Sequence, residues 1–238
     1  LTVVDHDAKT IRQLQIDRDT IVPVSVLGLF GNKAGSRDMQ ICLAHGYGVD
    51  KQERCKNTLA SVQALLGGQS LDLYVEIPLD GIGALNDLLG GVTVTLLDDF
   101  TASDPTMTAG KTLTLTGQQA EILVRSRMSM AVGTNEARMS RQRIFMDAAI
   151  PMIRERISEN SGFASEMLDS LSPYLTTNMV RGRMINELNK AYHYDVQPVE
   201  YLTGEHTIGD DGFVEFHAAS QSAVDFVLSA FYTKRDAQ

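Results

Sequence analysis

The sequence predicts a layered α/β fold in which helices cover a mixed β-sheet, and three observations support this prediction. Residues 71–97 alternate strand, helix and strand, a pair of strands begins the chain, and another pair precedes its last helix. The chain has 238 residues, of which 43% are hydrophobic and 21% are charged. It is therefore long enough to bury a substantial core, as one large domain or two small ones.

The first elements are two strands, over residues 1–5 and 10–17, joined by the turn HDAK. Helical patterns follow over residues 36–47 and 50–66, and the glycines of LLGG end the second helix. The segment LDLYVEIPL is typical of a buried strand, DGIGALNDLLGG of a short helix, and VTVTLL of another strand.

The loop-rich segment DDFTASDPTMTAGKTLTLTG comes next and is expected to fold as a hairpin, before a helix over GQQAEILVRSR. A long amphipathic helix is expected over residues 136–158. Its apolar residues recur at helical spacing and should face the core: Met139, Met146, Ile150, Ile153 and Ile157. Further helices are expected near 163–172, 178–192 and 219–231, with a strand pair near 199–216 around the turn GDDG.

Composition argues against several classes of protein. A formal net charge of −9 is unfavourable for a general nucleic-acid binder, because affinity for the phosphate backbone requires many spread-out cations. No run approaches the roughly 18 apolar residues of a membrane-spanning helix, and no signal segment opens the chain. The opening residues LTVVDHD resemble a strand already under way, so we expect the natural protein to extend upstream and any anchor to lie there.

The two cysteines, Cys42 and Cys55, are separated by twelve residues. This spacing suits neither a zinc ligand pair nor a CxxC redox motif. They are either unpaired buried thiols or one disulfide. No two histidines lie four residues apart, and we interpret each as structural or surface-exposed.

Arginine is concentrated in the segment ILVRSRMSMAVGTNEARMSRQR, residues 122–143. Five arginines occur there with a single acid, Glu136: Arg125, Arg127, Arg138, Arg141 and Arg143. Like charges at this density repel one another unless an anion is present, and the planar guanidinium fork matches a phosphate with two parallel hydrogen bonds. The segment therefore predicts a phosphate site. The alternative is that these arginines are solvated or paired with the many acids of the chain.

Helix geometry strengthens this prediction. Arg138 and Arg141 are three residues apart on one helix face, and Gln142 is next to Arg141. Thr134 or Asn135 is a suitable N-cap, which would place the positive end of the helix dipole beside the same arginines.

Arg18 lies at a strand end, where ligands collect in open α/β sheets. The alternative for Arg18 is a salt bridge with Asp17 or Asp19.

Four segments together resemble the LytR-CpsA-Psr domain: QIDRDTIVPV, LYVEIPLDGIGALNDLLGGVTVTL, LTGQQAEILVRSR and GTNEARMSRQR. They occur in the family's order and at similar spacing over residues 1–155, with a weaker likeness in GDDGFVEF. The resemblance implies a single domain over residues 1–238, folded as an α/β/α sandwich with a central mixed β-sheet flanked by helices. It also implies an apolar tunnel for a lipid tail, although leucines at these spacings more often belong to an ordinary core.

The resemblance further implies a phosphotransferase on the extracellular face of the cell membrane, anchored there in the full-length protein. Such enzymes move a glycopolymer, such as teichoic acid or capsular polysaccharide, from a polyprenyl-pyrophosphate carrier to peptidoglycan. The positions that match the family's pyrophosphate-binding residues are Arg18, Arg125, Arg127, Arg138, Arg141 and Gln142. Magnesium, held largely by aspartates, is the cofactor that the family implies.

Two departures from the family bear on catalysis. The aspartate pair that members place before the first strand has no counterpart here, so the expected magnesium ligands lie outside this chain. Asn135 stands where many members carry an acid, and a neutral amide binds a hard cation more weakly and cannot act as a base. Asp19 or Glu136 would then have to substitute. Asp19 is the candidate for a base or a metal contact; its alternative role is to cap the following turn.

Two other functions are compatible with the same residues. A non-catalytic module that binds lipid phosphate or cell wall would keep the arginines and lack the metal site. A nucleotide or nucleic-acid binder is disfavoured by the acidic remainder of the chain and by the absence of a glycine-rich phosphate loop. The export implied by the resemblance favours a Cys42–Cys55 disulfide.

Overall fold

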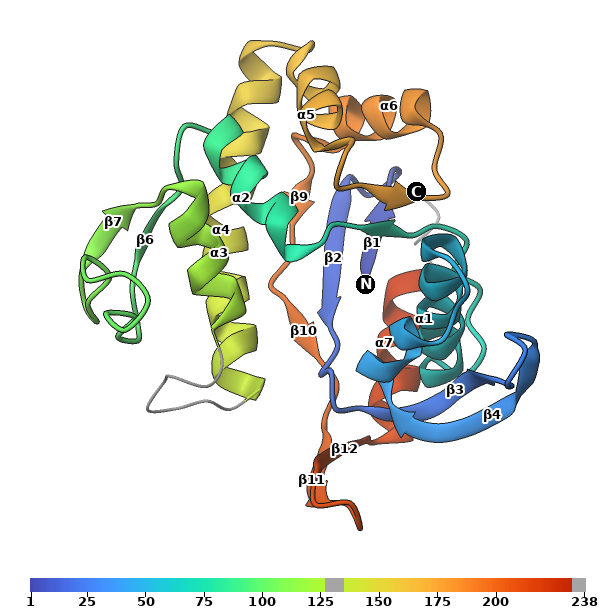
Figure 1. Ribbon diagram of the computed structural model, residues 1–238. Helices are drawn as coiled ribbons and strands as arrows, with labels where there is room; N and C mark the ends of the chain where they lie inside the picture. Colours follow the sequence, from blue (N-terminus) through green and yellow to red (C-terminus); the bar gives the residue numbers. More distant parts are fainter. Residues whose placement is uncertain (127–134, 233–238) are drawn as a thin grey trace. The chain divides into compact units, whose positions relative to one another are not determined.

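The computed structural model describes residues 1–126 and 135–232, which form two compact units (Figure 1). Unit 1 contains residues 1–74 together with the segment that begins at Tyr194, and unit 2 contains residues 75–193. Each unit has its own hydrophobic core.

A mixed sheet organises unit 1. Strands β1 (Thr2–Asp5) and β2 (Thr10–Gln15) are antiparallel, whereas β9 (Asp195–Val196) and β10 (Glu200–Tyr201) pair with β2 in parallel. Leu14 of β2 is buried in a cluster with Leu66, Ala223 and Phe226. Helix α7 (Ser220–Phe231) and the end of α1 (Lys51–Leu65) therefore pack against this sheet, as Figure 1 shows.

Two β-hairpins complete unit 1. Strands β3 (Ile21–Leu27) and β4 (Lys33–Gln40) form the first, and β11 (Gly204–Ile208) and β12 (Val214–Ala218) form the second. At the base of the first hairpin, Val22 and Val24 are buried against the 3-10 helix η1 (Ile41–Gly46) and helix α1. Asp50 caps α1 by accepting a hydrogen bond from the backbone N–H of Glu53.

The helix predicted over residues 36–47 is wrong over 36–40, which belong to β4, while its second half forms the short 3-10 helix η1. Met39 and Gln40 lie opposite Val22 and Ile21 in the antiparallel ladder. Strand β3, which is rich in β-branched residues, therefore provides backbone hydrogen bonds that hold this segment as a strand in spite of its helical sequence pattern. The strands predicted at 1–5 and 10–17, the helix at 50–66 and the strand pair around GDDG are confirmed.

Unit 2 is mainly helical. Its helices are α2 (Leu79–Leu88), α3 (Gly117–Arg125), α4 (Asn135–Glu159), α5 (Phe163–Leu171) and α6 (Arg181–Ala191). Two short antiparallel pairs accompany them: β5 (Val75–Glu76) with β8 (Thr176–Thr177), and β6 (Thr93–Thr95) with β7 (Thr112–Thr114). The helices predicted in this region are confirmed. The hairpin predicted within residues 98–117 is wrong in its bounds, because only β7 lies in that segment and its partner is β6, in the preceding VTVTLL.

The core of unit 2 corrects two details of the sequence analysis. The strand expected over LDLYVEIPL is limited to β5, and β5 and β6 belong to separate strand pairs rather than one sheet. On α4, Ile157 is buried and Met146 and Ile153 pack against the core, as expected, but the residues with no exposed surface are Phe145 and Ala149. They pack in the same cluster as Leu123 of α3.

Candidate functional site

The arginine-rich segment joins the end of α3 to the first turns of α4. Helix α3 begins with a capping box, in which the Thr116 side chain accepts from the Gln119 backbone N–H and the Gln119 side chain accepts from the Thr116 backbone N–H. Arg125 is its last residue. Arg127 and Thr134 of the predicted site fall outside the described residues, and Asn135 is the first residue of α4.

Arg125 is exposed and paired with acids. Its Nη2 donates to Asp80 Oδ1 of α2 at 2.5 Å and lies 3.9 Å from Glu121 Oε2, one turn back on α3. The side chain is 56% exposed, so its remaining donors can still reach a ligand. The sequence segment itself contains one acid, and the partner at Asp80 comes from another helix that the local pattern could not place.

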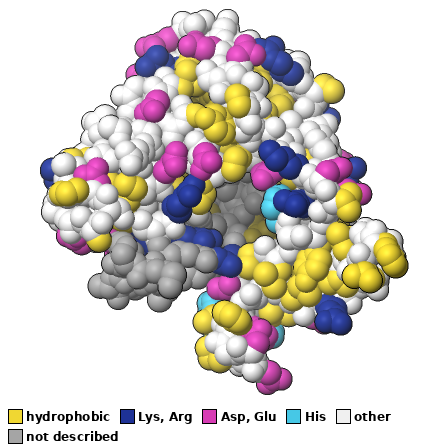
Figure 2. All heavy atoms as spheres, in the orientation of Figure 1, with side chains coloured by type: hydrophobic (Ala, Val, Ile, Leu, Met, Phe, Trp, Pro, Cys, Tyr) yellow, Lys and Arg dark blue, Asp and Glu magenta, His cyan; other side chains and the backbone are white. Residues whose placement is uncertain are grey.

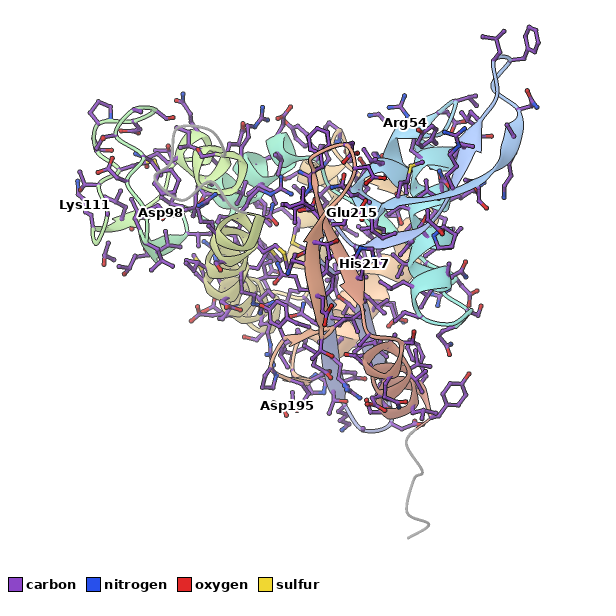
Figure 3. The ribbon with its side chains drawn as sticks, turned by 90° about the horizontal axis from the view of Figure 1, so that it is seen from below. Arg54, Asp98, Lys111, Asp195, Glu215 and His217 are labelled. Atoms are coloured by element: carbon purple, nitrogen blue, oxygen red, sulfur yellow. The ribbon has the colours of Figure 1, made fainter. Side chains whose placement is uncertain are left out.

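Arg141 is the most deeply buried charged side chain among the described residues of this segment, with 1% of its surface exposed. Its Nη1 donates to Asp98 Oδ2 at 2.7 Å, and its Nη2 donates to the Ser126 carbonyl at 2.9 Å. Its Nε is buried and makes no hydrogen bond with any described residue. Figure 3 labels Asp98, which follows β6. Arg141 therefore joins α4 to the end of α3 and to the loop after β6.

The other predicted residues of α4 are half-buried. Gln142 lies beside Arg141, and the Nε of Arg138 is a buried atom without a hydrogen bond in the described part of the chain, although Arg138 has other interactions. Arg143, which was not assigned to the site, pairs with Asp147 one turn further along the same helix. Arg138 is thus placed one helical turn before the buried Arg141, on the same face, as the spacing predicts.

Arg18 belongs to unit 1, in the turn between β2 and β3. Its Nε lies 3.3 Å from Asp19 Oδ1, and its Nη2 donates to Cys42 Sγ at 3.0 Å. The Arg18 carbonyl also accepts from the Cys42 backbone N–H at 3.1 Å. The salt bridge with Asp19 that the sequence offered as an alternative is therefore present, and the Arg18 side chain stays 26% exposed.

The turn that carries Arg18 is held by Asp17. Asp17 Oδ1 accepts from the Asp19 backbone N–H at 2.8 Å, and the Asp17 carbonyl accepts from the Thr20 N–H and hydroxyl. Asp17 Oδ2 lies 3.2 Å from His206 Nε2 on β11. Asp17 thus stabilises the turn, while the largely buried Asp19 faces the Arg18 guanidinium.

The disulfide favoured by the resemblance is wrong, because Cys42 and Cys55 are not joined by a disulfide bond. Cys42 Sγ accepts a hydrogen bond from Arg18, and Cys55 is buried in α1. The other possibility raised by the spacing was two buried thiols; both residues are thiols, but only Cys55 is buried, and Cys42 is partly exposed.

The described residues do not fit a complete magnesium site. Over residues 1–126 and 135–232, no group of three His, Cys, Asp or Glu side chains is arranged to hold a metal ion. Asp19 faces the guanidinium of Arg18, and Asp98 faces that of the buried Arg141. In the same described part of the chain, none of the helices combines the length and apolar character needed to span a membrane.

Comparison with known proteins gives one family and a set of similar structures. The model of the LytR_cpsA_psr family matches residues 1–226. A search of curated proteins gave no match.

Three of the similar solved structures illustrate the shared fold. Bacillus subtilis TagV is 20% identical with a TM-score of 0.72, over 98% of this chain and 87% of TagV. A structure of TagT bound to LI-WTA is 21% identical with a TM-score of 0.71, over 96% of this chain and 81% of that one. Protein gbs0355 from Streptococcus agalactiae is 20% identical with a TM-score of 0.76, over 98% and 79% of the two chains. These similarities confirm the predicted α/β fold with a mixed sheet.

Proposed function

Because the chain belongs to the LytR-CpsA-Psr family, as the resemblance of four sequence segments indicated, we propose that it transfers a cell-wall glycopolymer. The donor is a glycopolymer of the teichoic acid or capsular polysaccharide type on a polyprenyl-pyrophosphate carrier, and the acceptor is peptidoglycan. The family match over residues 1–226 carries this proposal. The similarity in fold to TagT bound to LI-WTA supports a glycopolymer substrate.

The proposed reaction is a phosphoryl transfer. A hydroxyl oxygen of a peptidoglycan sugar forms a bond to the phosphorus that carries the glycopolymer. The bridging P–O bond of the pyrophosphate breaks, polyprenyl phosphate leaves, and the hydroxyl proton passes to a base. Charge accumulates on the phosphate oxygens during this step, so fixed cations stabilise the transition state.

Arg125 and Arg141 differ in how much of the side chain is exposed to solvent, and we assign them different roles for this reason. Arg125 displays its guanidinium at the surface, and we assign it to direct phosphate binding together with Arg138. Arg141 is buried and hydrogen-bonded to Asp98 and Ser126, so it is a positioning residue that fixes the start of α4 against the end of α3. Arg18, Arg127 and Gln142 complete the proposed phosphate-binding residues by their match to the family pattern.

We also propose that the transfer depends on magnesium. When bound, the ion would neutralise charge on the leaving phosphate. The described residues do not supply a complete set of ligands for it. We propose that the full-length protein acts on the extracellular face of the membrane to which it is anchored.

The test is a transfer assay with a lipid-linked donor and a peptidoglycan acceptor, using the full-length protein. Arg138→Ala is expected to reduce turnover about a hundredfold, because one charge-assisted phosphate contact is worth about 1.5–3 kcal/mol and is strengthened as charge develops. Arg143→Ala is the matched control, since this arginine lies on the same helix and pairs with Asp147. Equal turnover in both variants would remove Arg138 from the phosphate site.

A non-catalytic module that binds lipid phosphate is the second candidate. It is favoured by Asn135, which stands where many family members carry an acid, and by the lack of a three-ligand metal group in the described residues. Such a module would bind a polyprenyl pyrophosphate with the same dependence on Arg138 but release no polyprenyl phosphate in the transfer assay. Detection of that product in the presence of magnesium would exclude it.

A further inference from the structure

We propose that the tip of the β3–β4 hairpin in unit 1 inserts into the interfacial region of an anionic lipid bilayer. Two large apolar side chains stand at this tip, in the five-residue connection between Leu27 and Lys33: Leu29 is 93% exposed and Phe30 is 91% exposed. In the described structure, neither side chain is covered by other residues. Adjacent apolar residues with this exposure are unusual on a water-soluble surface and indicate a contact with an apolar phase.

The apolar surface continues beyond the tip. Val49, which precedes α1, is 63% exposed. A Cβ atom placed on Gly31 would lie 3.1 Å from Val49 Cγ1, so Val49 lies directly against the turn of the hairpin. Figure 2 shows hydrophobic side chains gathered over this hairpin, and Figure 3 shows the hairpin extending beyond the rest of unit 1.

The charges on the hairpin match an anionic surface. From Ile21 to Arg37 the sequence contains no acid, and its two charged residues are Lys33 and Arg37, both exposed. The one acid of the hairpin is Asp38, which lies opposite Pro23 near the base, away from the tip. This positive segment belongs to a chain with a formal net charge of −9. Cations next to the inserted residues attract anionic headgroups, by about 1 kcal/mol for each Lys or Arg close to the membrane surface. Apolar residues flanked by such cations are typical of elements that lie in the interface.

The second hairpin of unit 1 provides an internal contrast. At the tip of β11–β12, Phe213 is 63% exposed and Ile208 is 68% exposed. The connection between them contains Asp210 and Asp211, so this tip is apolar and acidic. Anionic headgroups would repel it. The two hairpins therefore differ mainly in charge. We expect an anionic membrane to attract the tip of β3–β4 and to repel the tip of β11–β12.

The shape of the β3–β4 tip favours a bilayer over a protein partner. A stable protein interface buries about 800 Å² on each side, which is more than a narrow turn of five residues offers. A bilayer adapts to a small convex protrusion and needs no matching groove. The gain comes from the apolar area of Leu29, Phe30 and Val49 removed from water.

The test uses tryptophan fluorescence of the whole chain. Because the protein contains no tryptophan, Phe30→Trp and Phe213→Trp each introduce a single fluorophore at an exposed position, where folding is not at risk. Vesicles of phosphatidylglycerol and phosphatidylcholine are expected to shift the emission of Phe30→Trp to shorter wavelength and leave that of Phe213→Trp unchanged. Vesicles of phosphatidylcholine alone should give a weaker shift.

Co-sedimentation with the same vesicles tests the energetics. Phe30→Ser is expected to weaken partitioning about tenfold, and Phe213→Ser to leave it unchanged. Absence of vesicle binding by the wild-type chain, or equal losses in both variants, would overturn the proposal. If the wild-type chain does not bind vesicles but self-associates, and Phe30→Ser abolishes this self-association, then the hairpin tip contacts a second copy of the chain and not a bilayer. None of these measurements needs a polymer substrate, so they are independent of the transfer assay.

Discussion

The surroundings of each arginine, more than its place in the sequence, determine what its charge can do. Arg125 and Arg141 belong to the same cluster, yet one is 56% exposed and the other 1%. A buried guanidinium must satisfy its donors within the protein, since desolvation without hydrogen bonds is costly. Arg141 satisfies Nη1 through Asp98 and Nη2 through Ser126, and only its Nε lacks a partner in the described residues, whereas Arg125 keeps donors available to solvent and ligands.

The Arg141 contacts give a stability prediction. Arg141→Ala removes two hydrogen bonds and leaves Asp98 without its ion-pair partner, so we expect the free energy of unfolding to fall by about 3 kcal/mol. Urea denaturation measures this change. Arg125→Ala, which removes an exposed ion pair, is the control and should cost less than about 1 kcal/mol. Equal losses in the two variants would contradict the structural role of Arg141.

Asp104, in the loop between β6 and β7, gives a pH prediction. Hydrogen bonds from the Thr106 hydroxyl and then from Gln119 hold the pKa of Asp104 below its ordinary value of 3.8. Its stabilising effect is therefore complete above that value and is lost as the pH falls through the lower, folded-state pKa. Thr106→Val should raise the pKa of Asp104 toward 3.8 in an NMR titration of the carboxyl carbon. An unchanged pKa would show that Thr106 does not hold it.

Sequence reasoning at this scale found the arginines but not their partners. Their number and spacing predicted a positive cluster, because composition and helical periodicity are local properties. The acids that face them, Asp80 and Asp98, lie 45 and 43 residues away along the chain, and only tertiary structure brings them together. The same holds for the thiol of Cys42 beside Arg18.

The packing of α2 against α3 positions the helix that ends in Arg125. The two helices meet at glycines: a Cβ atom on Gly83 would lie 3.0 Å from the Gly117 carbonyl oxygen, and one on Gly117 would lie 2.9 Å from that of Gly83. Neither glycine has a positive φ, so close approach of the backbones explains both residues.

Gly117→Ala therefore should overpack this contact and lower the free energy of unfolding by about 1–3 kcal/mol. Gly182→Ala is the matched control. Gly182 lies in α6 with no atom within 4 Å of its added Cβ, and alanine there should raise stability by about 0.5 kcal/mol because it favours helix. Thermal unfolding of both variants measures these changes. A change in stability of the same sign in the two variants would contradict this explanation.

Element prediction succeeded where local periodicity and tertiary structure agree. Helix α4 was predicted almost to its ends, and it buries Phe145, Ala149 and Ile157 in the core of unit 2. The segment 36–47 was predicted as a helix but forms β4 and η1, because pairing with the β-branched strand β3 determines its structure. The same hairpin carries Leu29 and Phe30, which are exposed. Hydropathy alone does not show whether such a pair of apolar residues is exposed or buried.

At the scale of the whole molecule, each compact unit contributes part of the family pattern. Unit 1 holds the mixed sheet and Arg18, and unit 2 holds the segment from Arg125 to Arg143. The match of the family over residues 1–226 includes both. The alternation of strands and helices predicted the fold class, although the mixed sheet is formed by β1, β2, β9 and β10 and not by the strands of residues 71–97. The order of four segments predicted the family, but neither pattern could show which arginines are buried.

Binding of polyprenyl pyrophosphate to the full-length protein, measured by calorimetry, shows whether the arginines form a phosphate site. If the arginines hold the pyrophosphate, the wild-type protein binds it more tightly than polyprenyl monophosphate. Arg125→Ala and Arg138→Ala should then each weaken binding by about tenfold to a hundredfold, while Arg143→Ala has little effect. Unchanged affinity in both Arg125→Ala and Arg138→Ala, with the fold intact, would contradict the account.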